Sequence, residues 1–182
     1  NLLAEIKALV PGYVRISRVL RDIPPQFITG GPRDSLRGLL KERLQKNGLQ
    51  CECIRCREYG HRKRDGWETG EPRLVRMDYD ASEGREIFLS FEDEMGTLFG
   101  LLRLRIQDEP VPVMGGEYGG NVALIRELHI FGPEVPLAEQ RPEAAQHKGI
   151  GRALLRESER IASQEFQARQ MVVLSGVGAR EY

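Results

Sequence analysis

The spacing of hydrophobic residues is helical at the start of the chain and strand-like shortly after it. Residues 2–10 are apolar at intervals of three and four, and Pro11 with Gly12 ends the predicted helix. Residues 13–20 alternate between apolar and polar side chains, which predicts a half-buried strand. We interpret this helix and strand as the last unit of an α/β domain that begins upstream.

A second helix is predicted over residues 34–48. Its leucines fall on one face, so the helix is amphipathic. Asp34 or Ser35 is placed to cap its first turn, and Gly48 ends it.

From about residue 71 the pattern changes to short alternating runs that are separated by turn-forming residues. Three runs, residues 73–80, 85–93 and 96–107, predict antiparallel strands joined by tight connections. After a glycine-rich loop, residues 121–131 predict a fourth strand.

A long polar connection leads from the fourth strand to a glycine turn, and a helix over residues 152–167 follows. Leu154 and Ile161 lie on one face of this helix, which predicts packing against the sheet. Residues 171–175 predict a further strand. Hairpins followed by a strand, loop, helix and strand give an α+β fold over residues 71–182.

The composition is that of an ordinary soluble globular domain, with 40% apolar and 30% charged residues among 182. The 27 basic residues balance the 27 acidic ones, but basic residues gather between Arg15 and Arg64 and acidic ones over residues 83–94 and 127–143. A basic N-terminal third can follow a phosphate backbone. Solvated helix faces would carry the same charges and are the alternative.

Targeting signals are absent from the sequence. No apolar run approaches the roughly 20 residues of a membrane-spanning helix, and residues 1–10 are too short and too charged for a signal peptide. We therefore expect a cytoplasmic protein. The chain begins with Asn1 and stops at Tyr182, just after a predicted strand, so we expect it to be a piece of a longer protein.

The sequence QHKGIGRALL, residues 146–155, places two glycines at the start of the last predicted helix. Unpaired amides and the helix dipole make a helix N-terminus an anion site. Gly149 and Gly151 would let a bulky phosphate approach the backbone. The spacing differs from dinucleotide-binding and nucleoside-triphosphate motifs. A plain glycine turn before a helix is the alternative.

All three cysteines of the chain, Cys51, Cys53 and Cys56, lie within six positions, and His61 follows five residues later. Such a density in a cytoplasmic chain is typical of a metal site. Three unlinked thiols in a small core are the alternative; compartment and crowding disfavour a disulfide, and an iron–sulfur cluster would need a fourth thiolate. Zinc accepts mixed sulfur and nitrogen ligands. We predict a structural zinc on the three cysteines, with His61 or a histidine from the upstream part as fourth ligand.

Five blocks of the sequence, in order, resemble the C-terminal half of the catalytic subunit of Elongator, including its archaeal and bacterial single-chain forms. They are VRISRVLRDIP, LRGLLKERL, RELHIFGPEVPL, QHKGIGRALL and LSGVGAREY. The glycine turn also resembles the acetyl-coenzyme A site of the GNAT acetyltransferases. The resemblance covers nearly the whole chain. It implies an enzyme that adds a carboxymethyl-type group to carbon 5 of the wobble uridine of tRNA.

The resemblance also implies a division of the chain. Residues 1–30 would be the tail of a radical S-adenosylmethionine domain, residues 31–70 a helical and metal-binding linker, and residues 71–182 a GNAT acetyltransferase domain that is truncated at its C-terminus. S-adenosylmethionine and a 4Fe–4S cluster would belong to the upstream domain. The acetyl group of acetyl-coenzyme A would be released or activated when tRNA binds, and a radical formed upstream would drive its attachment.

Coenzyme residues follow from the same resemblance. The turn and the helix start would hold the pyrophosphate: Gln146, His147, Lys148, Gly149, Ile150, Gly151 and Arg152. The strand before them would line the thioester and pantetheine, mostly through backbone groups: Glu127, Leu128, His129 and Ile130. His129 is a candidate acid or base, or else a strand residue that faces the next strand. Tyr182 is a candidate for protonating the departing thiolate, but relatives carry a second tyrosine beyond it, so we expect the isolated piece to be weak or inactive.

Two rival functions stay open. One is protein lysine acetylation, which the same fold commonly performs, and the other is a metal-stapled RNA-binding or scaffolding piece without enzymatic activity. The link to a radical domain and the basic segment favour tRNA. That segment contains Arg15, Arg18, Arg21, Arg33, Arg37, Lys41 and Arg43. Expected partners are tRNA, the upstream domain of the same chain, and a second copy or Elongator subunits.

Overall fold

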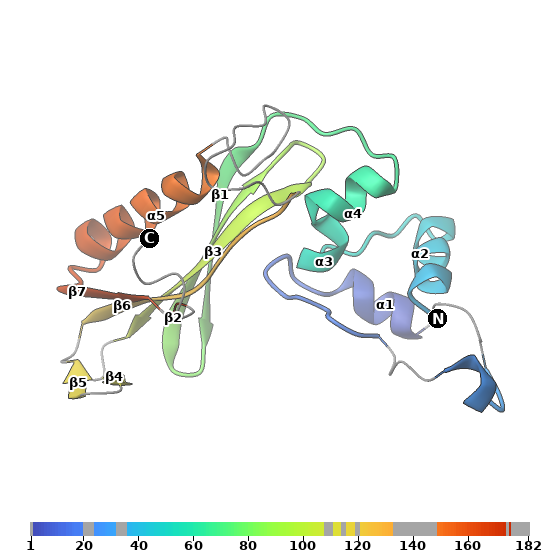
Figure 1. The fold of residues 1–182 in the computed structure, drawn as a ribbon, viewed down its shortest axis with the longest axis horizontal. Helices are drawn as coiled ribbons and strands as arrows, with labels where there is room; N and C mark the ends of the chain where they lie inside the picture. Colours follow the sequence, from blue (N-terminus) through green and yellow to red (C-terminus); the bar gives the residue numbers. More distant parts are fainter. Residues whose placement is uncertain are drawn as a thin grey trace.

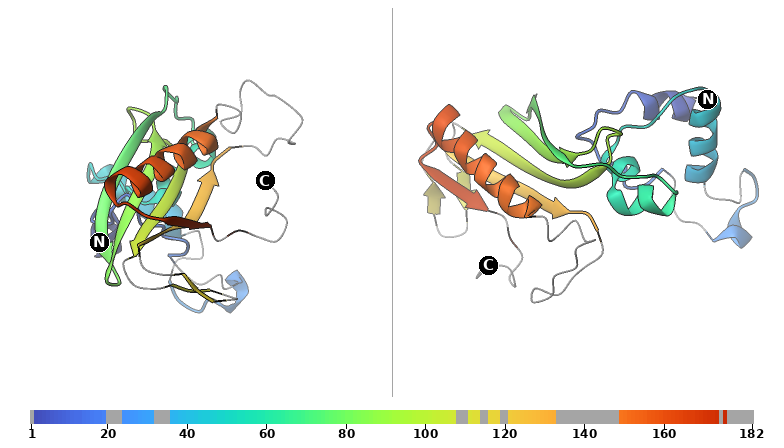
Figure 2. Two further views of the ribbon diagram at one scale, coloured as in Figure 1. Left: turned by 90° about the vertical axis from the view of Figure 1, so that its left-hand side faces the viewer. Right: turned by 90° about the horizontal axis from the view of Figure 1, so that it is seen from above.

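The computed structural model describes residues 2–19, 24–31, 36–107, 111–113, 116–118, 121–132, 149–173 and 175. These residues form a twisted sheet with one long helix across it and a group of short helices beyond one end of the sheet (Figure 1). Two further views show that the long helix lies on one face of the sheet, far from the short helices (Figure 2).

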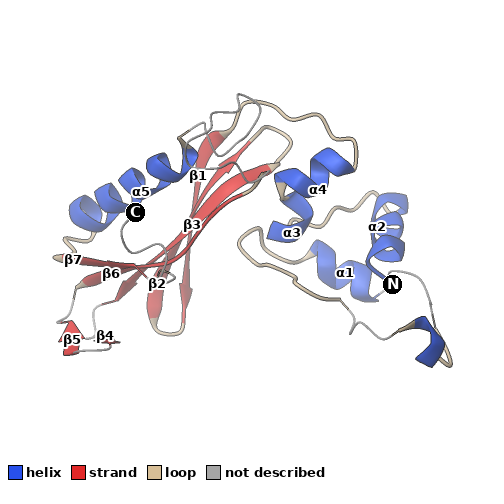
Figure 3. Cartoon of the chain, in the orientation of Figure 1, coloured by secondary structure: helices blue, strands red, loops and turns tan. Residues whose placement is uncertain are grey.

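The main sheet has five strands in the order β1, β2, β3, β6 and β7. They are β1 (Arg73–Ala81), β2 (Gly84–Glu92), β3 (Leu98–Gln107), β6 (Val122–Ile130) and β7 (Gln170–Val173). The first four run antiparallel to their neighbours, and β7 runs parallel to β6. The helices are α1 (Leu2–Ala8), α2 (Leu36–Lys46), α3 (Ile54–Arg57), α4 (Tyr59–Arg64) and α5 (Ile150–Arg160). Figure 3 shows how helices and strands are divided between the two ends of the molecule.

Helix α5 covers the apolar face of the sheet. Ile87 and Leu89 of β2 lie on one face of the sheet, and their register partners on β3 are leucines. Phe88 between them points to the other face and is buried as well. Leu154 and Ile161 belong to the same buried cluster as these strand residues. Each such side chain contributes about 1.5–3 kcal/mol when it is buried from water. The predicted packing of this helix on the sheet is confirmed.

The last turn of this helix differs from the sequence prediction. The α-helical part ends at Arg160, and a π-helical segment, Ile161–Glu165, continues it. The Phe166 amide donates to the Ile161 carbonyl at 3.3 Å, a spacing of five residues. Ile161 stays fully buried, so the wider turn keeps the apolar face on the sheet.

Helices α1 and α2 and the cysteine turn have a small core of their own. Ala4 of α1 packs with Leu40 and Leu44 of α2 and with Cys51 and Cys53. The predicted amphipathic helix is therefore present as α2. Gly48 follows it with a φ of +64°, a left-handed conformation that glycine adopts without cost. The predicted caps, Asp34 and Ser35, lie outside the described residues.

The predicted strand over residues 13–20 is wrong for its described part, residues 13–19. A strand needs a neighbouring strand, and none of the described strands pairs with this segment. Its carbonyl groups accept other hydrogen bonds: Tyr13 from the Arg103 guanidinium at 2.6 Å, Val14 from the Ile54 amide at 2.9 Å and Ile16 from the Arg37 guanidinium at 3.1 Å. The segment is thus held by arginine side chains and one amide.

The glycine-rich loop contains a small hairpin that the sequence did not predict. Strand β4 (Val111–Val113) pairs with β5 (Gly116–Tyr118) as a separate two-stranded sheet. Strands of three residues are too short to show a period of two, so the hydrophobic pattern did not reveal them.

The two ends of the molecule share part of their core. Ile54 of α3 and Tyr59 of α4 belong to the buried cluster of the sheet, and Glu58 forms a β-bridge with Leu98. The division at residues 30 and 70 stays a prediction. Among the described residues, every helix is too short or too polar to cross a membrane.

Candidate coenzyme and metal sites

Strand β6 has one edge that is only half paired. Its pairing with β3 extends from Val122 to Ile130, whereas β7 pairs with the opposite edge only from Val122 to Ile125. Over residues 126–130 that edge has no partner strand in the part of the chain that the structure describes. Its N–H and C=O groups can therefore bond to an extended ligand, as they would to another strand.

The N-terminus of α5 lies against the end of β6. A Cβ atom on Gly151 would lie 3.7 Å from Ile130 Cγ1. A Cβ atom on Gly100 of β3 would lie 2.8 Å from Ile130 Cδ1 and 3.0 Å from Ile150 Cγ2, which no side chain tolerates without movement of its neighbours. Gly100 thus permits the close approach that brings the start of α5 to the unpaired edge.

The first turn of α5 is open to an anion. Gly149 occupies the N-cap position with a φ of +71°, and none of the described side chains caps the helix. The Ala153 amide makes the first helical bond, to Gly149 O at 2.9 Å. An open groove of about 530 Å³ begins at Gly149 and runs past Arg152 and Arg156, with Leu74 of β1 and Glu157 in its wall, so it lies on the β1 side of the helix. Free amides and two guanidinium groups suit a phosphate.

The side chains of the predicted thioester strand contact the protein or the solvent. Glu127 Oε2 accepts from Arg103 Nε at 2.8 Å, and Leu128 is 40% exposed. The His129 ring packs on Phe131 with 4.5 Å between ring centroids. His129 also lines a cavity of about 310 Å³ together with His61. These contacts leave the backbone as the main group that the strand offers along its free edge.

Several predicted site residues lie outside the described residues. They are Gln146, His147 and Lys148 of the pyrophosphate turn, Tyr182, and Arg21 and Arg33 of the basic segment.

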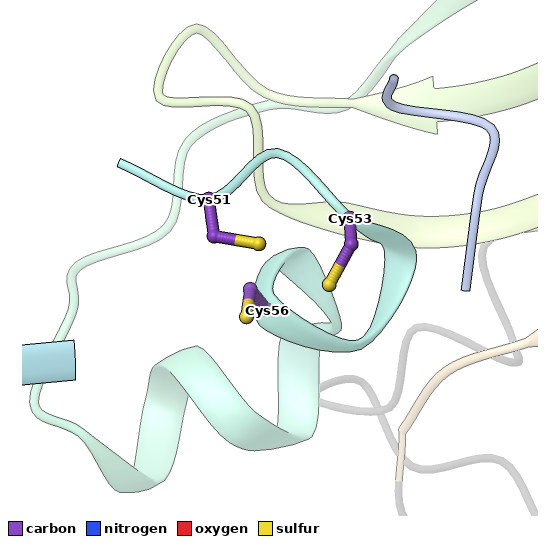
Figure 4. Close-up of side chains that lie close together, drawn as sticks. All are labelled: Cys51, Cys53 and Cys56. Atoms are coloured by element: carbon purple, nitrogen blue, oxygen red, sulfur yellow. The ribbon is translucent and has the colours of Figure 1, made fainter. Parts of the chain in front are cut away.

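The structure brings the three cysteines together. Their Sγ atoms all lie within 4.8 Å of one another (Figure 4). Cys51 precedes α3, Cys53 occupies its N-cap position and Cys56 lies within it, so one tight turn presents all three thiols. A tetrahedral zinc with bonds of about 2.3 Å places sulfur atoms about 3.8 Å apart. The three thiols fit such an ion as three of its ligands.

Charge at the trio favours a cation. Hydrogen bonds from Cys51 and Cys56 lower the pKa of Cys53, and the hydrogen bond with Cys51 raises the pKa of Cys56. Thiolates so close together repel one another unless a cation lies among them. Lys7 is 4% exposed, and its Nζ lies 3.8 Å from Cys56 Sγ. Three thiolates around Zn²⁺ leave one negative charge, which Lys7 would balance.

His61 is not brought into this cluster. Its Nε2 lies 3.3 Å from Glu58 Oε2, and burial lowers the pKa of His61. Among the described residues, no histidine, further cysteine or carboxylate lies close enough to the trio to be a fourth ligand. His61 does line the same cavity as Cys51 and Cys56. As fourth ligand, the ring of His61 would have to move toward the trio, and a carboxylate partner such as Glu58 on the other ring nitrogen is common for a zinc-bound histidine.

The described part of the basic segment is largely engaged in contacts within the chain. Arg15 pairs with Glu58 at 2.6 Å and Lys41 with Asp65 at 2.7 Å, while Arg37 donates to the carbonyls of residues 16 and 17. Arg18 is exposed. Surface charges in such pairs stay available to a polyanion because each pair is weak.

The chain is similar over its whole length to several known proteins. No family model matches the chain. A tRNA uridine(34) acetyltransferase of Dehalococcoides mccartyi is 58% identical over 182 residues, all of this chain and 40% of that protein. Elongator complex protein 3 of mouse is 43% identical over 189 residues, all of this chain and 34% of that protein. Methanocaldococcus infernus Elp3, solved with an N-terminal deletion, matches all of this chain and 43% of its own with a TM-score of 0.83 and 42% identity.

Over its whole length the chain is similar to these proteins. It spans less than half the length of these relatives and matches their C-terminal part. The predicted resemblance to the catalytic subunit of Elongator and the predicted α+β acetyltransferase fold are both confirmed.

The sequence did not reveal three side chains that lie at or beside the candidate sites. Lys7 beside the cysteine trio, Arg103 beside Glu127 and Trp67 in the cavity next to the trio had no signal in the sequence. None of the three belongs to a motif or a repeating pattern, so spacing and periodicity did not reveal them.

Proposed function

We propose that this chain is the acetyl-coenzyme A-binding part of an enzyme that modifies the wobble uridine of tRNA. The free edge of β6 beside the uncapped start of α5 carries the proposal. A pantetheine arm is extended and has amide groups that can pair with the edge, while a pyrophosphate suits the helix start. The relatives named tRNA uridine(34) acetyltransferase support tRNA as the second substrate.

The residues of the chain would bind and orient the coenzyme. Residues 146–152 would hold the pyrophosphate, and residues 127–130 would align the thioester through their backbone. Tyr182 or His129 would give a proton to the departing thiolate. A radical S-adenosylmethionine domain with its 4Fe–4S cluster, upstream in the whole protein, would supply the radical chemistry at carbon 5 of the base.

The basic segment would hold the tRNA backbone. Arg15, Arg18, Arg37, Lys41 and Arg43 lie on or beside the N-terminal helices, away from α5. Arg21 and Arg33 complete the proposed set. Coenzyme and tRNA would therefore approach from different ends of the molecule, and the sheet would connect them.

A structural zinc on Cys51, Cys53 and Cys56 would stabilise the turn between the helices and the sheet. Cys51 and Cys53 are buried beside α2. A zinc with four protein ligands has no coordination position left for a substrate, so the metal would have no part in the reaction. The whole protein would act in the cytoplasm, with the upstream domain, a second copy or Elongator subunits as partners.

Release of coenzyme A thiol tests the proposal. The intact protein, mixed with acetyl-coenzyme A, should release thiol much faster when tRNA is added. Acetylation of a lysine peptide at the same rate without tRNA would show the rival lysine acetyltransferase. Failure of the intact protein to bind acetyl-coenzyme A in calorimetry would show the rival scaffold.

A further inference from the structure

The cavity beside the cysteine trio, of about 330 Å³, lies among the N-terminal helices, and Cys51, Cys56 and His61 line one part of its wall. Its wall is strongly basic: five of the side chains that line it are cationic and one is acidic. They are Lys7, Arg37, Lys41, Arg55, Arg62 and Asp65. Asp65 is already paired with Lys41 at 2.7 Å. Away from the cysteines, this excess of positive charge attracts an anion.

Two of these arginines have unused donors. Arg37 Nη1 and Arg55 Nε are buried nitrogen atoms with no hydrogen-bond partner among the described residues. The other nitrogen of Arg37, Nη2, donates to the Ile16 and Ser17 carbonyls at 3.1 and 3.3 Å, so its guanidinium is held in place. A buried charged donor without a partner is costly. A phosphate at this position would satisfy both donors.

Another part of the wall is apolar and aromatic. Leu44 and Leu49 line it together with Trp67. The Arg62 guanidinium lies 4.6 Å from the Trp67 ring centroid, and Arg62 is itself fixed by hydrogen bonds to the Met95 carbonyl and, at 3.3 Å, to Thr97 Oγ1. An aromatic ring and a guanidinium plane are the surfaces on which unstacked bases are recognised.

We propose that this cavity binds one phosphorylated nucleotide, with its phosphate at Arg37 and Arg55 and its base beside Trp67. The volume lies at the lower end of ligand pockets and suits a single nucleotide. The nucleotide is either an unstacked residue of tRNA or a free mononucleotide. The first source deepens the proposed function and rests on it, whereas the second does not.

Trp67 provides a direct readout. It is the single tryptophan of this chain, and the difference in emission between the intact protein and its Trp67→Phe variant isolates its signal. Uridine monophosphate and a tRNA transcript are titrated separately. A change with the monophosphate identifies a free nucleotide as ligand, and a change with tRNA alone identifies a residue of the RNA. If neither ligand changes the emission, the proposal is wrong. An upstream part of the chain that filled the cavity would give this result.

Substitution of Arg55 tests the phosphate contact. The Arg55→Gln variant loses no recorded hydrogen bond at Nε, so it should fold normally. Its affinity for the ligand identified by Trp67 emission should be about tenfold lower. If that ligand is tRNA, the slope of log affinity against log salt should fall by about 0.7. Arg73→Gln is the matched control, because it removes one charge from a 75% exposed side chain outside the cavity.

Equal effects of Arg55→Gln and Arg73→Gln would contradict the proposal, because a general loss of positive charge would then explain both. Thiol release from acetyl-coenzyme A is measured on the same proteins. Uridine monophosphate can bind whether or not that release occurs, so failure of the proposed function and failure of this inference are distinguishable.

Discussion

Gly149 and Gly151 are glycines for different reasons. Gly149 has a φ of +71°, which a side chain disfavours by about 1–2 kcal/mol, so the turn itself requires glycine there. Gly151 has no such conformation, and a Cβ atom on it would make an ordinary contact of 3.7 Å with Ile130. The fold does not require glycine at this position. In the proposed coenzyme site, approach of the pyrophosphate to the helix start would require it.

The Gly151→Leu substitution should therefore separate binding from folding. Leucine favours a helix by up to about 0.8 kcal/mol over glycine, so the thermal stability of the intact protein should not fall. Its affinity for acetyl-coenzyme A should fall at least tenfold, about 1.4 kcal/mol, in calorimetry. Gly38→Leu on α2, where a Cβ atom meets nothing within 4 Å, is the control and should bind normally. Normal binding by Gly151→Leu would show a purely structural turn.

The Cys53→Ser substitution tests the proposed zinc site. The intact protein should contain about one zinc per chain, and Cys53→Ser should lose it together with several kcal/mol of unfolding free energy. Elemental analysis and thermal unfolding measure both. A chelator should lower the stability of the parent protein to that of the variant and leave the variant unchanged. A metal-free parent protein of unchanged stability would disprove the site.

Helix α5 is attached to the sheet by its apolar face and by a charged contact at its end. Arg76 of β1 donates to both oxygens of Glu165 at 2.9 and 2.8 Å and to Asp78 at 2.7 and 2.9 Å. These hydrogen bonds lower the pKa of Asp78 and of Glu165. Because all three side chains remain partly exposed, solvent screens the interaction.

The Arg76→Gln variant should lose about 1 kcal/mol of stability at pH 7. Because the pKa of each carboxyl is lowered in the folded state, the folded state is stabilised at pH values above the ordinary pKa values, which are 3.8 for Asp78 and 4.5 for Glu165. That contribution is lost as the pH falls through the lowered values, so variant and parent should converge in acid. Urea unfolding at stepped pH measures the difference. A difference that does not change with pH would point to packing of the Arg76 stem.

On the scale of the whole molecule, Arg57 joins the helical end to the sheet. Its side chain is 5% exposed, donates to the carbonyls of Glu52 and Gly12 at 2.8 Å each, and pairs with Glu92 of β2 at 2.5 Å. A Cβ atom on Gly12 would lie 3.0 Å from Arg57 Nη2, so glycine permits this approach. The N-terminal segment, α3 and the sheet meet at one guanidinium.

Replacement of Arg57 by methionine should loosen this junction. Removing one partner of a buried ion pair costs about 3–5 kcal/mol, chiefly through the charge left behind on Glu92. Hydrogen exchange of the intact protein should accelerate over residues 2–19 and 51–57 and stay unchanged in β2 and β3. Adding Glu92→Gln should restore part of the stability. Uniform acceleration along the chain would contradict this role of Arg57.

Local patterns in the sequence predicted most of the elements and one of the sites. Hydrophobic spacing suffices for α2, α5 and the long strands because each buries one face over many residues. Cys51, Cys53 and Cys56 are so close in sequence that a single turn can bring their thiols together. The segment at 13–19 shows the limit of this reasoning, because its alternation predicted a strand although no neighbouring strand was available.

The sequence by itself determined the resemblance to the catalytic subunit of Elongator, the α+β class and the cysteine trio, since motifs and hydrophobic periods are each contained in a short segment of the chain. Tertiary structure alone decided which edge of β6 is left free and which cations reach the buried sites. Lys7 meets Cys56 from 49 positions away, and Arg103 meets Tyr13 from 90. Contacts at such separations arise from the packing of whole elements, and no period or motif in the sequence encodes them.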